Sequence, residues 1–172
     1  MHIDTPRLVL RPFGPDDEET VIGLFTDPGF MEWSMRGVRT PEVARQHLQE
    51  EIDNQAEHGF SKLAVIDRQD GRVLGYCGFG IADTAEGELI EFGYRLLPDA
   101  RGKGFVTEAG QAVIEDAFAR LALPYIQAYV NAENAASRRV LDKLGFAYER
   151  DIIVDERDWL LYRLERPGSG QP

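Results

Sequence analysis

The residues best suited to chemistry lie between positions 97 and 109. This stretch reads Leu97-Pro98-Asp99-Ala100-Arg101-Gly102-Lys103-Gly104-Phe105-Val106-Thr107-Glu108-Ala109, so a strand pattern ends, a glycine-rich turn with two cations follows, and a helix pattern begins at once. Glycines permit positive φ and let successive backbone N–H groups point at one anion. The helix N-terminus adds unpaired donors and the positive end of a dipole. The stretch predicts a pyrophosphate-binding loop, although a tight turn with incidental charges has the same spacing.

The order of the residues rules out two familiar phosphate-binding motifs. A Walker loop requires Ser or Thr after Gly-Lys, whereas Gly104 follows Lys103. The run Gly75-x-x-Gly78-x-Gly80 has no helix pattern after it and lies inside an apolar strand pattern, unlike the glycines of a dinucleotide fold. These three glycines predict a β-bulge or close backbone packing instead.

Apolar periodicity and turn signals divide the chain into eleven elements. Thr40-Pro41-Glu42 is typical of a helix start, and Gly59 of a helix end. The elements are a strand at 8–10, helices at 16–26 and 41–58, strands at 62–67, 73–81 and 89–97, a helix at 106–122, a strand at 125–130, a helix at 133–144, and strands at 146–154 and 158–165. This order predicts one mixed α/β domain over residues 1–166 and a disordered tail over residues 167–172.

Four segments in register resemble one family, the GNAT acetyltransferases. Arg101-x-x-Gly104-x-Val106 is similar to their Gln/Arg-x-x-Gly-x-Gly/Ala pyrophosphate loop, and Thr107-Glu108-Ala109 to its usual continuation. The other three segments resemble the opening strand, the strand before the loop, and the last helix of the ribosomal-protein N-terminal (RimJ/RimL-like) branch: Thr5-Pro6-Arg7-Leu8-Val9-Leu10-Arg11-Pro12, Glu91-Phe92-Gly93-Tyr94, and Asn134-x-x-Ser137-x-x-Val140-Leu141-x-x-Leu144-Gly145-Phe146. The resemblance spans residues 5 to about 164.

The resemblance implies a fold and a reaction. The fold is a central, mostly antiparallel sheet with a V-shaped split, flanked by about four helices. The reaction is transfer of acetyl from acetyl-CoA to a primary amine by direct attack, without a metal or a covalent enzyme intermediate. The acceptor implied is a protein N-terminus or a small cationic amine, and the protein would be a monomer or a homodimer. The alternative is a catalytically silent module that binds acyl-CoA as a sensor or scaffold.

The resemblance also implies which residues hold acetyl-CoA. The pyrophosphate would lie on the loop formed by Arg101, Gly102, Lys103, Gly104, Phe105 and Val106. Pantetheine would pair with the backbone near Tyr94 and Leu96, where a glycine at position 93 suits either a bulge or close packing. Asn134 would hydrogen-bond the pantetheine arm, or it would serve only as a helix-start residue.

Glu91 and Ser137 are the catalytic candidates. Glu91 would be the general base; alternatively it is an exposed or structural acid, the latter bonded to Arg11, in which case Glu88 or Glu108 would be a weaker substitute. Ser137 would protonate the leaving sulfur, because position 141 is leucine where much of the superfamily has a tyrosine, or it would be a small packing residue. A covalent route through Cys77 is rejected, because no histidine falls in a partner position.

Charge is distributed unevenly along the chain. The net charge is −11, yet residues 1–90 hold 17 acids against 8 Lys and Arg, while residues 91–146 hold 7 of each. Such acidity argues against a nucleic-acid partner. The acidic first half and Trp33, in an aromatic connection, predict a wall that attracts a cationic amine. Otherwise the acids only keep the protein solvated and Trp33 plugs the sheet.

The remaining composition restricts the class of protein. One cysteine cannot form an internal disulfide, and with three scattered histidines it offers no structural zinc site. No apolar run approaches the roughly 20 residues of a membrane helix, and the first residues lack the order of a signal peptide. These features predict a cytoplasmic protein without a membrane partner.

Overall fold

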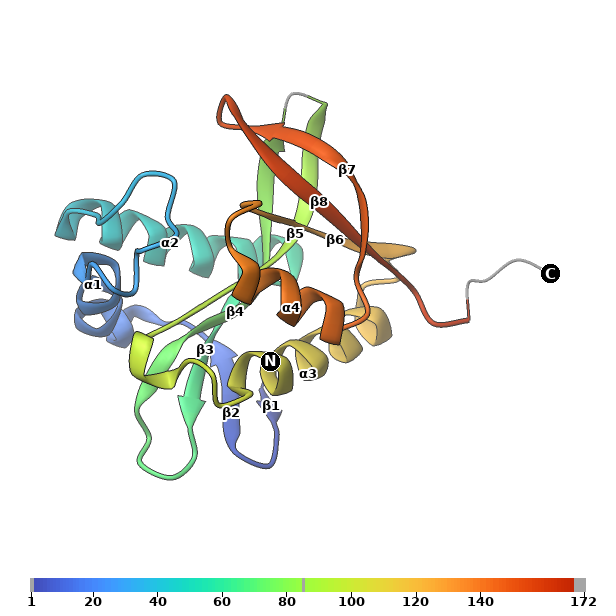
Figure 1. The fold of residues 1–172 in the computed structure, drawn as a ribbon. Coiled ribbons are helices and arrows are strands. Elements are labelled where there is room, and N and C mark those ends of the chain that lie inside the picture. Colours follow the sequence, from blue (N-terminus) through green and yellow to red (C-terminus); the bar gives the residue numbers. More distant parts are fainter. Residues whose placement is uncertain (1, 85, 169–172) are drawn as a thin grey trace.

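The computed structural model of the protein describes residues 2–84 and 86–168. In these residues eight strands form a single sheet in the order β1-β2-β3-β4-β5-β6-β8-β7, with four α-helices (Figure 1). The strands are β1 (Ile3–Asp4), β2 (Leu8–Pro12), β3 (Lys62–Asp67), β4 (Val73–Thr84), β5 (Gly87–Leu96), β6 (Tyr125–Val130), β7 (Ala147–Val154) and β8 (Arg157–Glu165). The helices are α1 (Glu18–Thr26), α2 (Pro41–His58), α3 (Phe105–Arg120) and α4 (Ala135–Lys143), with 3₁₀ turns at Pro15–Asp17 and Pro98–Ala100.

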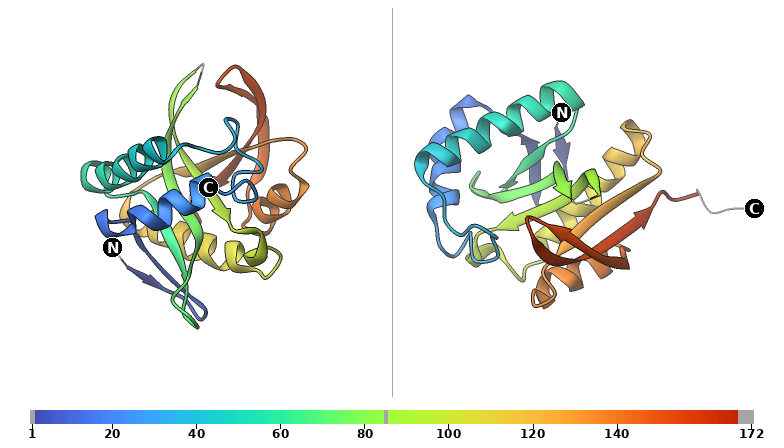
Figure 2. Two further views of the ribbon diagram at one scale, coloured as in Figure 1. Left: turned by 90° about the vertical axis from the view of Figure 1, so that its left-hand side faces the viewer. Right: turned by 90° about the horizontal axis from the view of Figure 1, so that it is seen from above.

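The helices cover opposite faces of the sheet (Figure 2). Strand residues such as Ala64 pack under α1 and α2, with Ala44 and Leu48 of α2. Alternate residues, including Phe92 and Leu96 of β5, pack into the larger core with α3 and α4. Because side chains alternate along a strand, residues 91, 93 and 95 lie on the α1–α2 face.

The sheet divides between β5 and β6. Every other neighbouring pair is antiparallel, whereas β5 and β6 are parallel and share one registered pair, Glu91 with Gln127. β5 remains paired with β4 as far as Leu96, so beyond Glu91 its other edge has no strand partner within the described residues. This geometry is the V-shaped split of the predicted GNAT fold, and the fold class is confirmed.

Local signals in the sequence give the helix ends correctly. The Thr40 side chain accepts a hydrogen bond from the backbone N–H of Val43, Pro41 occupies the first turn, and Gly59 ends α2 in the left-handed region at φ 74°. Asn134 caps α4, because its side-chain oxygen accepts the Ser137 N–H at 3.0 Å. The helix-start role considered for Asn134 is therefore present in the structure.

Three features differ from the expectations or refine them. Strand β1 was not predicted, because two residues are too short for a periodic signal. No bulge lies at Gly93, since the β4–β5 register runs unbroken through Gly78 and Gly93. The register shift occurs between β3 and β4 beside Gly75, whose φ is 149°, and a Cβ at Gly78 would lie 2.3 Å from the Ser61 carbonyl oxygen. The glycine run thus combines a bulge with close packing, as predicted.

Two of the remaining expectations concern the ends of the chain and the membrane. Most of the predicted tail, residues 169–172, lies outside the described residues. Of the helices in residues 2–84 and 86–168, none is long and apolar enough to cross a membrane.

Candidate active site

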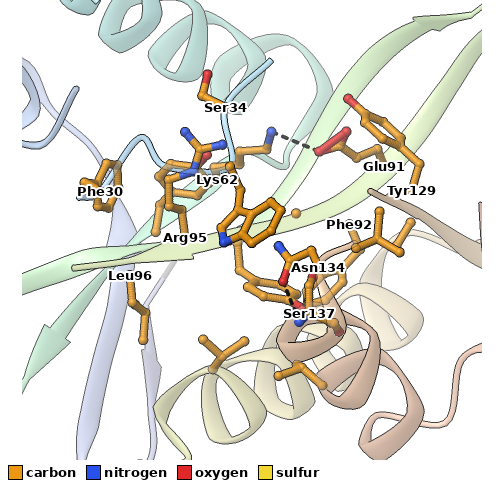
Figure 3. A pocket seen from close by; sticks show the side chains of 18 of the residues that line it. Phe30, Ser34, Lys62, Glu91, Phe92, Arg95, Leu96, Tyr129, Asn134 and Ser137 are labelled. Atoms are coloured by element: carbon orange, nitrogen blue, oxygen red, sulfur yellow. Dashed lines mark hydrogen bonds and ion pairs between the residues drawn. The ribbon is translucent and has the colours of Figure 1, made fainter. Parts of the chain in front are cut away.

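A pocket of about 740 Å³ opens where β5 and β6 diverge (Figure 3). Its walls come from β5, β6, the start of α3, the first turns of α4, and the connection between α1 and α2 (residues 27–40). The ten labelled side chains in Figure 3, from Phe30 to Ser137, line it from these elements and from β3. Eleven of the residues singled out in the sequence line this pocket: Trp33, Glu91, Tyr94, Leu96, Arg101, Gly102, Gly104, Phe105, Val106, Asn134 and Ser137. Lys103 is exposed and does not line it.

The glycine-rich loop has the backbone form that its sequence predicts. Gly102 and Gly104 have φ values of 73° and 80°, in the left-handed region that glycine adopts without strain. Helix α3 begins at Phe105, and its first internal hydrogen bond runs from Glu108 N–H to the Gly104 carbonyl at 3.0 Å. The preceding amides have no helical acceptor, so they and the helix dipole suit an anion.

The Arg101 side chain forms its hydrogen bonds with groups outside the glycine-rich loop. Its guanidinium donates to the Leu96 carbonyl at 3.0 Å, to the Gly29 carbonyl at 2.6 Å and to Glu32 at 2.8 Å. Arg101 therefore ties the loop to the α1–α2 connection. With its guanidinium committed, the loop can hold a phosphate mainly through backbone N–H groups.

A second arginine fixes the loop from the opposite side. Arg7 donates to the Lys103 carbonyl at 2.9 Å, pairs with Glu108 at 2.6 Å and lies 4.6 Å above the centre of the Phe105 ring. Glu108 also accepts the Thr5 hydroxyl at 2.6 Å. Burial opposes the charge of Glu108, but these hydrogen bonds hold its pKa below the usual range. Glu108 thus clamps the opening strand to the loop and is not free to act as a base.

Glu91 lies on the floor of the pocket as half of a buried ion pair. It is 8% exposed, and its Oε1 lies 3.1 Å from the Nζ of Lys62, as Figure 3 shows. Arg11 pairs with Asp17 at 2.7 Å, so the structure does not support a Glu91–Arg11 contact. Burial disfavours the Lys62 ammonium, yet Glu91 and its neighbours outweigh this and raise the pKa of Lys62. Lys62 therefore remains charged, with its ammonium held beside the Glu91 carboxyl group.

Glycines make room for this ion pair. A Cβ on Gly93 would lie 2.5 Å from Glu91 Oε1 and 3.2 Å from Lys62 Cε, and one on Gly80 would lie 3.3 Å from the same Cε. The Lys62 side chain passes over β4 at Gly80 to reach Glu91 on β5, beside Gly93. Gly93 is consequently a packing glycine in this chain, which is one of the two roles that the sequence left open.

Sequence reasoning missed Lys62, Glu51 and Tyr129, which surround Glu91 in the pocket. Glu51 accepts the backbone N–H of Lys62 at 2.8 Å, and burial raises its pKa. Burial, followed by the charge of Glu91, raises the pKa of Tyr129. A signal for Glu51 was available, because Ala44, Leu48 and Glu51 share one face of α2 at helical spacing.

Ser137 has a tyrosine partner that the sequence did not indicate. The hydroxyl oxygen of Tyr94 lies 2.7 Å from Ser137 Oγ and 3.1 Å from the Ser137 carbonyl. Burial raises the pKa of Tyr94, so the phenol stays protonated. Leu141, at the position where the family resemblance would place a tyrosine, is 1% exposed and belongs to the core. A tyrosine hydroxyl thus reaches this part of the pocket from β5 instead of α4.

The α1–α2 connection divides its aromatic residues between core and pocket. Phe30 is completely buried, whereas Trp33 is 41% exposed in the pocket wall. The interpretation of Trp33 as a plug of the sheet is therefore wrong.

Cys77 is buried and its burial raises the thiol pKa, which makes the thiol inert. Across residues 2–84 and 86–168, no cluster of three or more His, Cys, Asp or Glu could hold a metal.

Comparisons with known proteins agree with this geometry. The model of the "Acetyltransferase (GNAT) domain" family matches residues 7–147. Two similar relatives are the uncharacterized N-acetyltransferases p20 of Bacillus licheniformis, 32% identical over 84% of this chain and 82% of its own, and YnaD of Bacillus subtilis, 32% identical over 92% of each.

Solved structures share the fold at lower identity. A GnaT-family acetyltransferase from Bordetella pertussis, described as putative, has a TM-score of 0.85 at 21% identity, covering 95% of this chain and 99% of its own. RimL, described as a ribosomal L7/L12 alpha-N-protein acetyltransferase in complex with coenzyme A, has a TM-score of 0.80 at 18% identity, covering 96% and 98%. The family model, the relatives and the split sheet agree, and the chain belongs to the GNAT acetyltransferase family.

Proposed function

We propose that this protein transfers the acetyl group of acetyl-CoA to a primary amine by direct attack, as a member of the RimJ/RimL-like branch. One observation carries the proposal: a buried Glu91 carboxylate and an amide-lined glycine loop open into the same pocket at the split of the sheet. Acetyl-CoA is the general donor of the family, and the RimL structure is described with coenzyme A.

Acetyl-CoA would bind along the split. The pyrophosphate would lie on the amides of residues 102–106, and pantetheine along the edge of β5 near residues 94–96, which has no strand partner among the described residues. The side-chain oxygen of Asn134 is occupied by the helix cap, so its amide nitrogen would be the group that contacts pantetheine. The thioester would then lie between β5 and the first turn of α4.

Glu91 is proposed to accept the amine proton, directly or through a water molecule. Once the protonated amine has lost one proton, its neutral nitrogen attacks the thioester carbonyl and the nitrogen–carbon bond forms. Collapse of the tetrahedral intermediate breaks the carbon–sulfur bond, and the nitrogen loses a second proton. The Lys62 ammonium lies beside the Glu91 carboxyl group, and Glu51, whose pKa burial raises, can receive the proton in turn. Of the two protons that the nitrogen loses, one returns to the thiolate and the other passes to solvent.

Ser137 is proposed to hydrogen-bond the leaving sulfur. When Tyr94 donates its hydroxyl hydrogen to Ser137 Oγ, the serine hydrogen is free to point at the thiolate. Because burial raises the Tyr94 pKa, this pair stabilises the thiolate by hydrogen bonding more readily than by giving up its own proton.

The acceptor is proposed to be a small amine in preference to a protein N-terminus. Trp33 offers an exposed aromatic face, and Glu91 and Glu51 offer carboxylates to a protonated amine. The closing hairpin of β7 and β8 turns after Val154 and resumes at Arg157, so it projects little chain to read a peptide. A catalytically silent acyl-CoA sensor would share the loop but would not need the buried Lys62–Glu91 pair.

Acetyl-CoA should raise the melting temperature of the protein. A ligand at one hundred times its Kd stabilises the folded state by about 2.7 kcal/mol. Thermal unfolding with acetyl-CoA, CoA, ATP and NAD measures this effect, and both CoA compounds should act. A shift with ATP or NAD and none with acetyl-CoA would refute the cofactor assignment.

Ser137→Ala should lower kcat about tenfold and leave the KM for acetyl-CoA nearly unchanged, because a thiolate contact acts in the transition state. Tyr94→Phe should give a smaller loss in kcat, since it acts through Ser137. Steady-state kinetics with one amine measure both. An unchanged kcat in Ser137→Ala would reduce Ser137 to a packing residue.

A further inference from the structure

Four half-buried cations line the pocket: Arg39, Lys62, Arg95 and Arg101. Lys62 pairs with Glu91 and Arg101 with Glu32. Within the described residues, Arg39 and Arg95 have no carboxylate at ion-pair distance. Among the half-buried cations of the pocket wall, these two arginines are therefore the ones without a paired carboxylate; Arg139 and Lys143 also line the pocket but are exposed to solvent.

Their present contacts leave most of both guanidinium groups unused. Arg39 donates to the Ser34 hydroxyl at 3.3 Å. Arg95 contacts the Met31 sulfur at 2.9 Å and lies 5.8 Å from the centre of the Phe30 ring. A guanidinium has five N–H donors, so each arginine has several to offer a ligand. Figure 3 shows Arg95 directed to the same side of β5 as Lys62 and Glu91.

The arginines also lie close enough to repel one another. Burial, followed by the charges of Arg36 and Arg95, lowers the pKa of Arg39. Arg36 itself is paired with Asp155 at 2.9 Å and is exposed. Half-buried like charges without counterions destabilise a protein, and a bound anion would relieve that cost.

Besides the two arginines, the pocket wall contains a hydrogen-bond donor that has no acceptor. The indole N–H of Trp159 is buried without a hydrogen-bond partner in the described part of the chain, and Trp159 also lines the pocket. Trp159 packs edge-on against Tyr129 at 5.4 Å, beside Glu91. Unsatisfied buried donors favour a ligand that accepts hydrogen bonds.

The geometry points to an anion-binding subsite at Arg39 and Arg95 that takes the carboxylate of a small, amino-acid-like acceptor whose amine faces Glu91. This inference rests on the proposed function and specifies its acceptor. The amine end of such an acceptor is cationic, while its other end is anionic. Such an acceptor carries both charges. Glu91 and Arg95 lie four residues apart on one face of β5, so the same wall offers a carboxylate to the amine and a guanidinium to the carboxylate.

The test compares amines that differ only in the carboxylate. Glycine, β-alanine, γ-aminobutyrate and ε-aminocaproate, each beside its carboxamide and its alkylamine, are assayed for thiol release from acetyl-CoA. The carboxylate should raise kcat/KM roughly tenfold or more in at least one series. The double variant Arg39→Gln/Arg95→Gln should lose that preference while keeping its Kd for acetyl-CoA. Arg45→Gln, which removes an exposed pair with Glu18 outside the pocket, is the matched control.

Each outcome decides the inference separately from the proposed function. Turnover of amines with no preference for a carboxylate, or a preference that survives in the double variant, would overturn the subsite and leave the acetyltransferase proposal standing. A weakened acetyl-CoA Kd in the double variant would assign the arginines to the cofactor and also overturn it. If no amine is turned over, the proposed function fails, and calorimetric titration of the four amino acids into the CoA complex decides the subsite. Binding lost in the double variant supports it, and no binding refutes it.

Discussion

Glu91→Gln is expected to lower kcat about a hundredfold or more, because a positioned general base typically contributes that much. Glutamine keeps the shape of the side chain, but its amide cannot act as a base near neutral pH. The Kd for acetyl-CoA should be unchanged, since Glu91 lies on the α1–α2 face of β5 and the cofactor loop at the start of α3. Steady-state rates with one amine and calorimetric binding of acetyl-CoA measure the two effects.

The control must account for the lost ion pair, because Lys62 would lose its partner. Thermal melts of both proteins, with and without acetyl-CoA, show whether the variant is folded. Glu88→Gln, an exposed change on the same strand, should leave kcat within about twofold of the parent. If a folded Glu91→Gln protein kept full activity, Glu51 would be the general base instead. Glu51→Gln would then lose activity.

Gly104→Val is expected to abolish acetyl-CoA binding. Gly104 has φ 80°, where a β-branched side chain is strained by about 1–3 kcal/mol. An added Cβ would lie 3.4 Å from the Arg7 guanidinium, and the branched side chain would crowd the free amides of α3, where the phosphate would lie. Calorimetric titration with acetyl-CoA measures the loss, which we expect to exceed a hundredfold in Kd.

Gly71→Val is the matched control for this change. Gly71 has φ 74° in the β3–β4 turn and nothing within 4 Å of an added Cβ, so it carries the same backbone strain far from the pocket. Both variants should lose similar stability, and only Gly104→Val should lose the ligand. Normal acetyl-CoA binding by a folded Gly104→Val protein would place the pyrophosphate elsewhere.

Local sequence signals were sufficient for most of the fold. Helix α2 illustrates this, because Thr40, Pro41 and Gly59 fix its ends through contacts within a few residues. The glycine-rich loop was predicted for the same reason, since the positive φ of Gly104 and the start of α3 are adjacent in the chain. Strand β1 lacked such a signal at two residues.

The missed parts of the site depend on contacts between distant segments. Lys62 reaches Glu91 only because the register of β3, β4 and β5 aligns Gly78 with Lys62 and Gly93. Tyr94 meets Ser137 only after α4 packs beside the split. Neither contact has a periodic signature in the sequence, because strand register is set by the assembled sheet. The charge of residues 1–90 was likewise a poor guide to the wall, where Arg39 and Arg95 gather.

The most direct measurement of the central claim follows acetyl-CoA and an amine panel together by mass spectrometry. The purified protein is incubated with acetyl-CoA and each amine, and acetylated amine, free CoA and intact protein are quantified over time. The account predicts acetylated amine and free CoA in equal amounts, no acetylated protein intermediate, and both products nearly lost in Glu91→Gln. Acetyl-CoA that binds tightly, yet releases no CoA above the uncatalysed rate with any amine, would contradict the account and identify a silent acyl-CoA-binding module.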